Sequence, residues 1–406
     1  MLATLFIILF LLELYVFMGL RSNFQGKALT IVMVIDVFMF LTTIAAFISM
    51  FSFYSRGLSV TIGWINILMG LSVAFTVTKL VYAIPLLLED IYRVGNYIVQ
   101  LFQSGGSHAF ASRRKFVTTA GLALASIPLG TFLHGVFIGR YSFRVFRESL
   151  SFDDLPEAFD GFKIAQISDV HSGSFDSMEA MKKGLDLLME QKPDIILFTG
   201  DLVNNLSEEF DPYINLFKSI SAPFGKFSVL GNHDYGLYIP WNDKTKQEEN
   251  LNRIKAHHPA MGFDLLNNTN RLIEKNGQSI RLVGVENWGR PPFPPHGDID
   301  KALENVGDKE FTILMSHDPH HWDDIVLKHK KHVHLTLSGH THGMQMGIDL
   351  PDFKWSPVSL RYKRWAGLYK ELGQYIYVNR GFGHIGFPGR VGIMPEITII
   401  ELKKKF

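Results

Sequence analysis

Four long apolar stretches dominate the first third of this chain and constrain its fold more than any other feature. A helix needs about 20 consecutive apolar residues to cross the hydrocarbon core of a bilayer. The stretches of about this length or longer are residues 1–20, 29–53, 58–88 and 116–138. The first is not expected to be a cleaved signal peptide, because no basic segment precedes it and further spans follow directly. We therefore predict a membrane anchor of about four transmembrane helices over residues 1–138.

The charged residues divide the chain at the same boundary. Residues 1–138 hold 12 of the 79 charged residues, whereas the remaining 268 residues hold 67, or 25%, as in an ordinary soluble domain. With 32 basic and 35 acidic residues, the second part offers no electrostatic footprint for nucleic acid. The absence of cysteine excludes a disulfide framework and cysteine nucleophiles. We expect a linker over residues 139–160 and a globular domain over residues 161–406.

The basic residues between the spans predict how the chain crosses the membrane, because cytoplasmic loops carry an excess of Lys and Arg. The basic loops are the first and the third, which hold Arg21, Lys27, Arg93, Arg113, Arg114 and Lys115. Arg113 and Arg114 also fit an internal twin-arginine export signal, although a cytoplasmic charge cluster explains them equally well. Both interpretations predict a multi-pass protein of the cytoplasmic membrane with its globular domain outside the cytoplasm. The basic residues just beyond the fourth span argue against this orientation: Arg140, Arg144 and Arg147.

Three ionisable residues fall inside the apolar spans, namely Glu13, Asp36 and Lys79. Such groups are costly in a bilayer and usually face the interior of a helix bundle in pairs. One interpretation is a polar path for transport or for protons. We favour an interhelical contact between Lys79 and a carboxylate, because nothing else in the sequence indicates a conduit.

Beyond residue 151 the apolar pattern changes to short strands that alternate with helices. Amphipathic helices are predicted at residues 177–191 and 208–219, and residues 238–261 read as a polar insertion that contains a helix. Strands are predicted at residues 162–167, 195–198, 227–230, 280–285, 311–315, 335–337, 375–378 and 397–402. This alternation predicts an α/β domain.

Polar residues follow five of these strands. They are Asp169 and His171; Asp201; Asn232, His233 and Asp234; His317; and His340 and His342. Ligands of open α/β sheets gather at the carboxyl ends of the strands, so these side chains are expected to converge on one point. The neighbouring glycines allow tight turns that aim a side chain back into such a site.

Oxygen and nitrogen donors of this kind suit Mn, Fe or Zn. Two divalent ions about 3.5–4 Å apart can hold a phosphate and activate water, so a phosphoester can be cleaved without a serine or cysteine nucleophile. Each short motif alone is more often a turn or a loop. Five of them in order, each after an apolar strand, predict a metal site.

The same motifs resemble those of the calcineurin-like metallophosphoesterases over roughly residues 163–402. The resemblance implies a four-layer αββα sandwich after the transmembrane helices. It also implies that two divalent metal ions are bound: one by Asp169, His171 and His342, the other by Asn232, His317 and His340, with Asp201 between them. His233 would contact the phosphate and assist the leaving oxygen, and Asp234 would orient His233. Residues 379–383 and 394–396 resemble a bacterial membrane-attached branch of the family, which includes enzymes similar to UDP-diacylglucosamine pyrophosphatases.

The other histidines and aromatic residues are given less specific interpretations. We expect surface positions for His257, His258, His320, His321, His329, His332 and His334. His384 is expected to be an ordinary loop histidine rather than part of the site rim. The aromatic-rich stretch at residues 353–369 either meets lipid headgroups or an acyl chain, or packs inward as a rim loop.

Together these features predict a membrane-anchored phosphohydrolase with two metal ions. Its substrate would be a phosphorylated small molecule or a lipid, and the cleaved bond a phosphomonoester, a phosphodiester or a pyrophosphate. One alternative is a transporter or receptor with an accessory metal-binding domain. Another is a binding module that keeps its metals without turnover, but the complete set of residues, including His233, argues against it.

Overall fold

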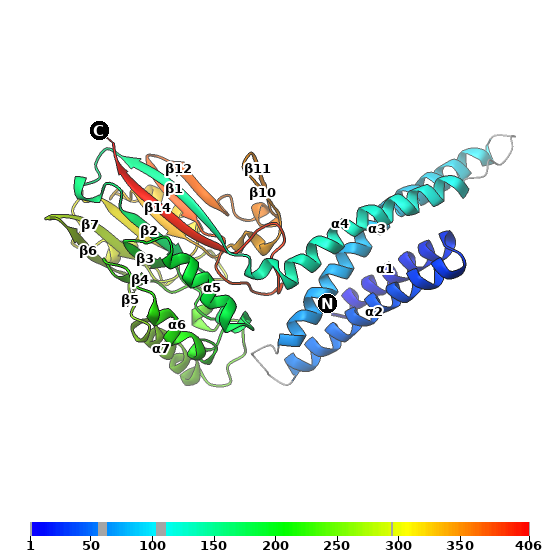
Figure 1. Cartoon of the computed structure of the whole chain (residues 1–406), viewed down its shortest axis with the longest axis horizontal. Helices are drawn as coiled ribbons and strands as arrows, with labels where there is room; N and C mark the ends of the chain where they lie inside the picture. Colours follow the sequence, from blue (N-terminus) through cyan, green and yellow to red (C-terminus); the bar gives the residue numbers. More distant parts are fainter. Residues whose placement is uncertain (1, 56–62, 103–110, 294, 406) are drawn as a thin grey trace. The chain divides into compact units, whose positions relative to one another are not determined.

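The computed structural model describes residues 2–55, 63–102, 111–293 and 295–405. The chain divides into two compact units, and the boundary along the chain lies between Phe137 and Ile138 (Figure 1). Each unit has a buried apolar core of its own.

The first unit is helical. Its helices are α1 (Leu2–Asn23), α2 (Gly26–Ser55), α3 (Gly63–Leu101) and α4 (Ala111–Phe137). Within the described residues, these four are long and apolar enough to cross a membrane, which confirms the predicted spans. The third helix continues past the predicted end at residue 88, and the predicted start at residues 58–62 lies outside the described part of the chain.

The three ionisable residues of the spans form one buried cluster. Lys79 Nζ on α3 lies 2.5 Å from Glu13 Oε2 on α1 and 2.9 Å from Asp36 Oδ1 on α2. All three side chains are largely or fully buried, so the ammonium group satisfies two carboxylates that would otherwise be unpaired in an apolar surrounding. This arrangement confirms the expected interhelical contact, and it ties three helices together.

The predicted twin-arginine segment lies at the start of α4 and is also bound within the helical unit. Arg114 Nη1 lies 3.1 Å from Glu89 Oε2 of α3, and it also pairs with Asp90. The Arg113 guanidinium lies 3.7 Å from the centre of the Tyr92 ring. Both arginines therefore have partners on α3.

The second unit contains two six-stranded sheets. In spatial order, the first consists of β1 (Arg144–Phe152), β14 (Glu396–Lys404), β2 (Lys163–Ile167), β3 (Ile195–Phe198), β4 (Lys226–Ser228) and β5 (Asp264–Leu265). The second consists of β12 (Gly367–Glu371), β13 (Gln374–Val378), β9 (Leu335–Ser338), β8 (Thr312–Met315), β7 (Gln278–Gly284) and β6 (Thr269–Lys275). A separate hairpin is formed by β10 (Ile348–Leu350) and β11 (Phe353–Trp355).

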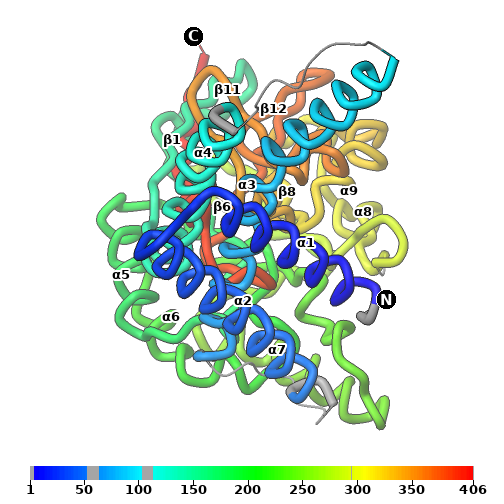
Figure 2. The backbone as a smooth tube through the Cα atoms, turned by 90° about the vertical axis from the view of Figure 1, so that its right-hand side faces the viewer, coloured from blue at the N-terminus to red at the C-terminus, as the bar shows by residue number. Residues whose placement is uncertain are grey.

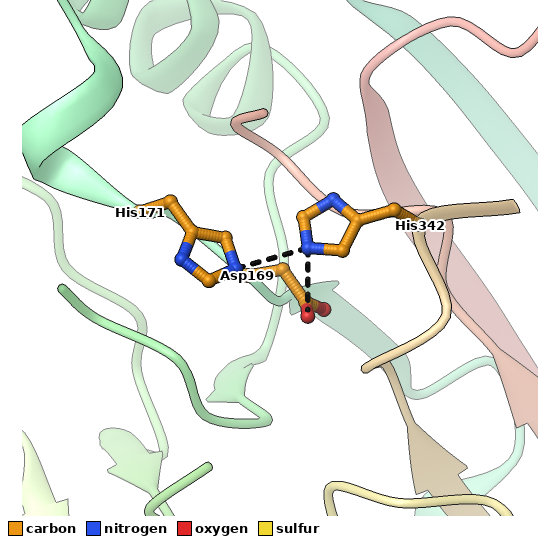
Figure 3. A group of neighbouring side chains, drawn as sticks. All are labelled: Asp169, His171 and His342. Carbon is orange, nitrogen blue, oxygen red and sulfur yellow. Dashed lines mark hydrogen bonds and ion pairs between the residues drawn. The ribbon is translucent and has the colours of Figure 1, made fainter. Parts of the chain in front are cut away.

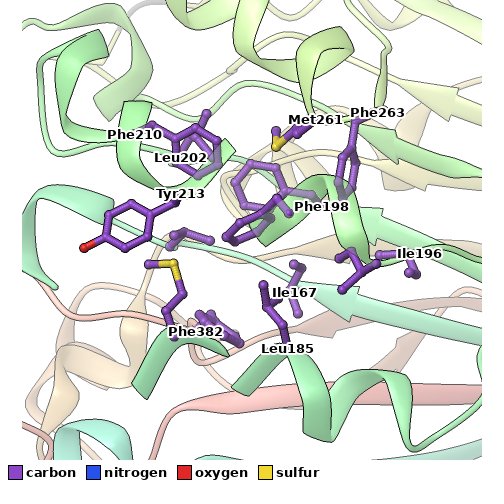
Figure 4. Close-up of a cluster of buried hydrophobic side chains, with 14 of the residues drawn as sticks. Ile167, Leu185, Ile196, Phe198, Leu202, Phe210, Tyr213, Met261, Phe263 and Phe382 are labelled. Carbon is purple, nitrogen blue, oxygen red and sulfur yellow. The ribbon is translucent and has the colours of Figure 1, made fainter. Parts of the chain in front are cut away.

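The alternation of side chains along the strands builds four layers. On β3, Ile195 and Leu197 face the second sheet, whereas Ile196 and Phe198 face a cluster that includes helix residues (Figure 4). The helices are α5 (Met178–Met189), α6 (Ile214–Ser219) and α7 (Lys244–Ala260) on the first sheet, and α8 (Ile299–Ala302) and α9 (His320–Asp324) on the second. Figure 2 shows the two groups of helices on different sides of the domain. The expected αββα arrangement of two mixed sheets is therefore present.

The segment expected to be a linker contributes a strand. β1 pairs in parallel with β14 from Arg144↔Glu396 to Phe152↔Lys404. Leu150 and Phe152 are buried between the sheets, while the residue between them is exposed. The charged residues of this edge strand, which lie mainly toward solvent, obscured its apolar alternation in the sequence.

Candidate metal centre

Nine predicted side chains lie on loops that follow five strands. They are Asp169 and His171 after β2, Asp201 after β3, Asn232, His233 and Asp234 after β4, His317 after β8, and His340 and His342 after β9. Parallel pairing of β2, β3 and β4, and of β8 and β9, puts the carboxyl ends of each group at one edge of its sheet. Hydrogen bonds then join the loops of the two sheets, such as His340 N–H to the Asp169 carboxylate at 3.0 Å.

One triad consists of Asp169, His171 and His342 (Figure 3). His342 Nε2 lies 3.0 Å from His171 Nε2 and 3.2 Å from Asp169 Oδ1. Burial lowers the pKa of His171 well below its usual value, so this ring is neutral. Burial alone would raise the pKa of Asp169, but His342 and His317 outweigh it, and the carboxylate stays ionised. A carboxylate and neutral imidazoles are the forms that bind a divalent metal.

A second triad consists of Asp201, His317 and His340. The side-chain oxygen of Asn232 joins it, 2.7 Å from His340 Nδ1 and 3.1 Å from His317 Nε2. The amide nitrogen of Asn232 donates to Tyr238 Oη at 2.6 Å, which turns the amide oxygen toward the two histidines. The set again offers only oxygen and nitrogen donors, which fit Mn, Fe or Zn.

Asp201 lies between the two triads. Its Oδ2 is 3.1 Å from His317 Nε2 and 3.5 Å from His171 Nε2. Its Oδ1 accepts the backbone N–H of His233 at 2.8 Å, which leaves Oδ2 for the centre. Burial would raise the pKa of Asp201, but His317 and His233 lower it well below its usual range. An ionised oxygen therefore faces both triads.

The two histidines of the second triad have opposite pKa shifts. Burial would lower the pKa of His317, but Asp201 and Asp169 raise it to about 10. Burial lowers the pKa of the neighbouring His340 to about 4. A divalent cation would bind the deprotonated ring of His317, so binding at this triad would release a proton.

Groups outside the triads fix the orientation of the rings. Nδ1 of His171 donates to Val203 O at 3.2 Å, and Nδ1 of His317 donates to Thr199 O at 2.7 Å. Each contact directs Nε2 of the ring toward the centre. His340 has the opposite orientation, because its Nδ1 faces the centre and its Nε2 lies 2.7 Å from Tyr362 Oη.

Tyr362 was not predicted as a site residue. It belongs to the aromatic-rich stretch, which the structure divides: Tyr362 and Trp365 are buried, whereas Phe353 and Trp355 are exposed. The buried residues of this stretch, Tyr362 and Trp365, pack inward, as in the rim-loop alternative. In the sequence, Tyr362 is one of several aromatic residues among basic residues, so nothing distinguished it from its aromatic neighbours.

The predicted contact between Asp234 and the His233 ring is not the one that the structure shows. The Asp234 carboxylate accepts backbone N–H groups of Gly231 at 2.9 Å, Asp201 at 3.1 Å and Leu202 at 2.8 Å. His233 Nδ1 lies 2.8 Å from Asn204 O. Asp234 therefore holds the β3 and β4 loops together, and a backbone carbonyl orients the ring of His233.

The backbone of these loops is unusual at the ligands themselves. Five of the predicted ligands have positive φ angles of 47–71°: Asp169, His171, Asp201, His340 and His342. Residues other than glycine rarely adopt this conformation, and where they do it is often at a functional site. Gly339 is required for steric reasons instead, because a Cβ there would lie 2.0 Å from Ser168 Oγ and 2.2 Å from Asp169 Oδ2.

Most of the remaining histidines are buried, so the predicted surface positions are wrong for five of them: His257, His258, His320, His321 and His334. Each fills a local apolar or hydrogen-bonded position. For example, His334 stacks on Phe311, and its Nε2 lies 2.6 Å from Asp154. His384 is buried against Tyr141 and Phe175 and is not part of either triad.

The two-sheet fold and the paired His/Asp triads define a metal-dependent phosphoesterase, and the comparisons with known proteins agree. Residues 162–344 match the family described as calcineurin-like phosphoesterase. Residues 1–140 match the family described as probable calcineurin-like phosphoesterase, transmembrane domain. The chain belongs to the calcineurin-like metallophosphoesterases, in a form with a transmembrane domain.

Two bacterial relatives illustrate this membership. An uncharacterized metallophosphoesterase of Bacillus subtilis, YkuE, is 32% identical over 303 residues, which cover 72% of this chain and 98% of YkuE. The phosphodiesterase YaeI of Escherichia coli is 27% identical over 299 residues, which cover 72% of this chain and 99% of YaeI. The enzyme class predicted from the strand-end motifs is therefore confirmed.

Proposed function

We propose that this protein hydrolyses a phosphoester or pyrophosphate bond with two divalent metal ions. The observation that carries the proposal is the position of Asp201 Oδ2, 3.1 Å from His317 Nε2 and 3.5 Å from His171 Nε2. One ion would be held by Asp169, His171 and His342. The other would be held by Asn232, His317 and His340, and Asp201 would contribute to both. Two ions so held neutralise phosphate charge and lower the pKa of water.

The side chains around the triads have the remaining tasks. His233 keeps its Nδ1 on Asn204 O, which leaves Nε2 toward the site. When Nε2 carries a proton, it would donate a hydrogen bond to a phosphate oxygen or protonate the leaving oxygen. Its ring is held between Tyr238, stacked at 4.2 Å, and His171, edge-on at 4.9 Å. Asp234 fixes the loops that carry Asp201 and His233. These contacts place the acid group before substrate binds.

The test is hydrolysis of bis-(p-nitrophenyl) phosphate by the full chain, purified in detergent and supplied with manganese. Asp201→Ala and His233→Ala are compared with His332→Ala, an exposed histidine outside the triads. We expect turnover to fall at least about 100-fold in the first two variants and to remain within about twofold in the third. Equal turnover in all of them would contradict the proposed mechanism.

The membrane anchor supports a lipid-linked or cell-envelope substrate and a catalytic domain outside the cytoplasm. In the helical unit, Ser22 near the end of α1 lies 3.4 Å from Arg114 at the start of α4, so the two basic loops belong to one end of the unit. The positive-inside rule then assigns that end to the cytoplasm. A reporter fused after Phe406 tests the orientation, and signal from a reporter that is active only in the cytoplasm would overturn it.

A further inference from the structure

The β10–β11 hairpin has one apolar face and one polar face. It begins three residues after η8 (His342–Gln345), the short helix that starts at the metal-triad residue His342. Its register pairs Ile348 with Trp355 and Leu350 with Phe353, whereas Asp349 pairs with Lys354. Side chains opposite each other in a hairpin share a face, and successive residues alternate. Four large apolar side chains therefore lie together on one face.

The polar face is fixed to the domain. Asp349 Oδ2 lies 2.9 Å from Nε of Arg380, a buried residue whose Nη1 is 2.7 Å from Glu396 Oε2. The base of the hairpin is held as well, because Gly347 N–H donates to Val391 O at 2.9 Å and Ser356 Oγ donates to Gly343 O at 2.7 Å. These contacts prevent the hairpin from turning its apolar face inward.

The opposite face is exposed. The exposed fractions are 44% for Ile348, 57% for Leu350, 56% for Phe353 and 47% for Trp355. Met344 and Leu360, which flank the hairpin in sequence, are also exposed. A contiguous apolar surface of this kind usually meets a membrane or another protein.

The chain leads from a membrane-spanning helix into the catalytic domain through a short segment. The membrane-spanning helix α4 ends at Phe137 and β1 begins at Arg144, so six residues connect them. Fully extended, they reach about 20 Å. Three of them form a helical turn, Gly139–Tyr141, in which Arg140 and Tyr141 both bind Asp176 of the domain, so the reach is shorter still. The domain is therefore held close to the membrane surface.

The composition of the hairpin favours lipid over a protein partner. Trp and Phe are enriched where a bilayer meets water. Exposed basic residues suit anionic headgroups, and the loop after the hairpin carries Arg361 and Lys363. We propose that the apolar face of β10–β11 inserts into the surface of the bilayer that the chain spans. Such docking would present the metal centre to phosphate groups at the membrane surface. The use of these phosphates as substrates rests on the proposed function, but the docking itself does not depend on it.

A cysteine-free chain allows a direct test, because a single introduced cysteine is labelled without background. The full chain is placed, one copy per disc, in nanodiscs of phosphatidylethanolamine and phosphatidylglycerol, with an environment-sensitive probe on Phe353→Cys. The matched control is Leu372→Cys, an exposed apolar residue between β12 and β13. We expect blue-shifted emission and at least about threefold stronger quenching by spin-labelled lipids at position 353 than at position 372.

Equal quenching at the two positions would overturn the proposal. The probe at position 353 could instead be shielded only when two copies share a disc. That result would overturn the membrane docking and would show that the apolar face contacts a second copy of the chain. Hydrolysis of bis-(p-nitrophenyl) phosphate within about twofold of the parent shows that each labelled variant keeps its metal centre. Normal quenching in a chain without any hydrolysis would contradict the proposed function alone.

Discussion

At the scale of single residues, the centre depends on groups that hold its ligands in one orientation. Backbone carbonyls perform this task for His171 and His317, and the hydroxyl of Tyr362 performs it for His340. A fixed orientation removes rotamers that a metal would otherwise have to select against, and it sets the protonated nitrogen of each ring. Tyr362 is therefore a positioning residue, since it contacts a proposed ligand and not the substrate.

We expect Tyr362→Phe to weaken binding at the second triad. The variant keeps the buried ring and removes only the oxygen 2.7 Å from His340 Nε2. Loss of such an outer partner typically costs about 10–100-fold in metal affinity or activity. Turnover should therefore require a higher manganese concentration and recover when manganese is in excess. Tyr375→Phe, on β13, is the control, and an identical manganese dependence of all three proteins would refute this role.

Glu209 makes the stability of the domain depend on pH. Its carboxylate accepts backbone N–H groups of Asn204, Asn205 and Leu206, yet burial raises its pKa to about 7. A pKa that is higher in the folded state means that the folded state binds more protons. The stabilisation is complete below about 4.5, the ordinary pKa, and is lost as the pH rises through about 7.

Glu209→Gln removes this titration. The melting temperature of the variant minus that of the parent should therefore rise between pH 5 and pH 8, even if the variant is less stable overall. Glu248→Gln, an exposed residue of α7, provides the control, and its difference should stay constant. Melting curves of the full chain in detergent supply the measurement, and a difference that falls as the pH rises would contradict a raised pKa for Glu209.

At the scale of elements, the strand-end loops pack so closely that position 339 has room only for glycine. Gly339 follows β9 of the second sheet, and it approaches Ser168 and Asp169, which follow β2 of the first. The loop of one sheet thereby places a ligand of the other, since His340 N–H also binds the Asp169 carboxylate. The centre is a junction between two sheets rather than a property of either.

We expect Gly339→Ala to disrupt this junction. Its Cβ would lie 2.0 Å from Ser168 Oγ and 2.2 Å from Asp169 Oδ2, so Asp169 must move. Overpacking of this kind costs about 1–3 kcal/mol of stability. A ligand displaced by about 1 Å can cost about 100-fold in turnover. Gly307→Ala, whose Cβ would meet only the flexible side chain of Glu310 at 3.1 Å, should keep turnover within about twofold. Normal activity of the Gly339 variant would show that the loop can relax.

The sequence revealed the elements whose signal is local. Buried strands such as β3 and β8 read as apolar runs between polar loops, and each ligand motif lies directly behind its strand. β1 was missed, because its alternation is weak and its partner β14 lies at the other end of the chain. The orienting groups were missed for a related reason: Val203 and Thr199 act through their backbone, and Tyr362 lies 22 residues from His340. Such contacts depend on the tertiary fold and leave no pattern along the chain.

At the scale of the whole molecule, the two units have different charge requirements. The candidate metal centre holds ionised carboxylates close together, and a bound cation would neutralise them. The helical unit also buries two carboxylates, Glu13 and Asp36, and Lys79 supplies the neutralising charge from within the chain. If this cluster is structural, it should affect the stability of the helical unit without affecting the chemistry of the catalytic domain.

We therefore expect Lys79→Met to destabilise the full chain without changing the turnover of the molecules that remain folded. Removing one partner of a buried ion pair leaves uncompensated charge and costs about 3–5 kcal/mol, whereas replacing all partners together is often nearly neutral. The triple variant Glu13→Gln, Asp36→Asn, Lys79→Met should accordingly recover most of the melting temperature in detergent. Hydrolysis of bis-(p-nitrophenyl) phosphate per folded molecule should stay within about twofold in both variants. A triple variant that melts normally but has lost turnover would show that the buried charges serve the reaction rather than the fold.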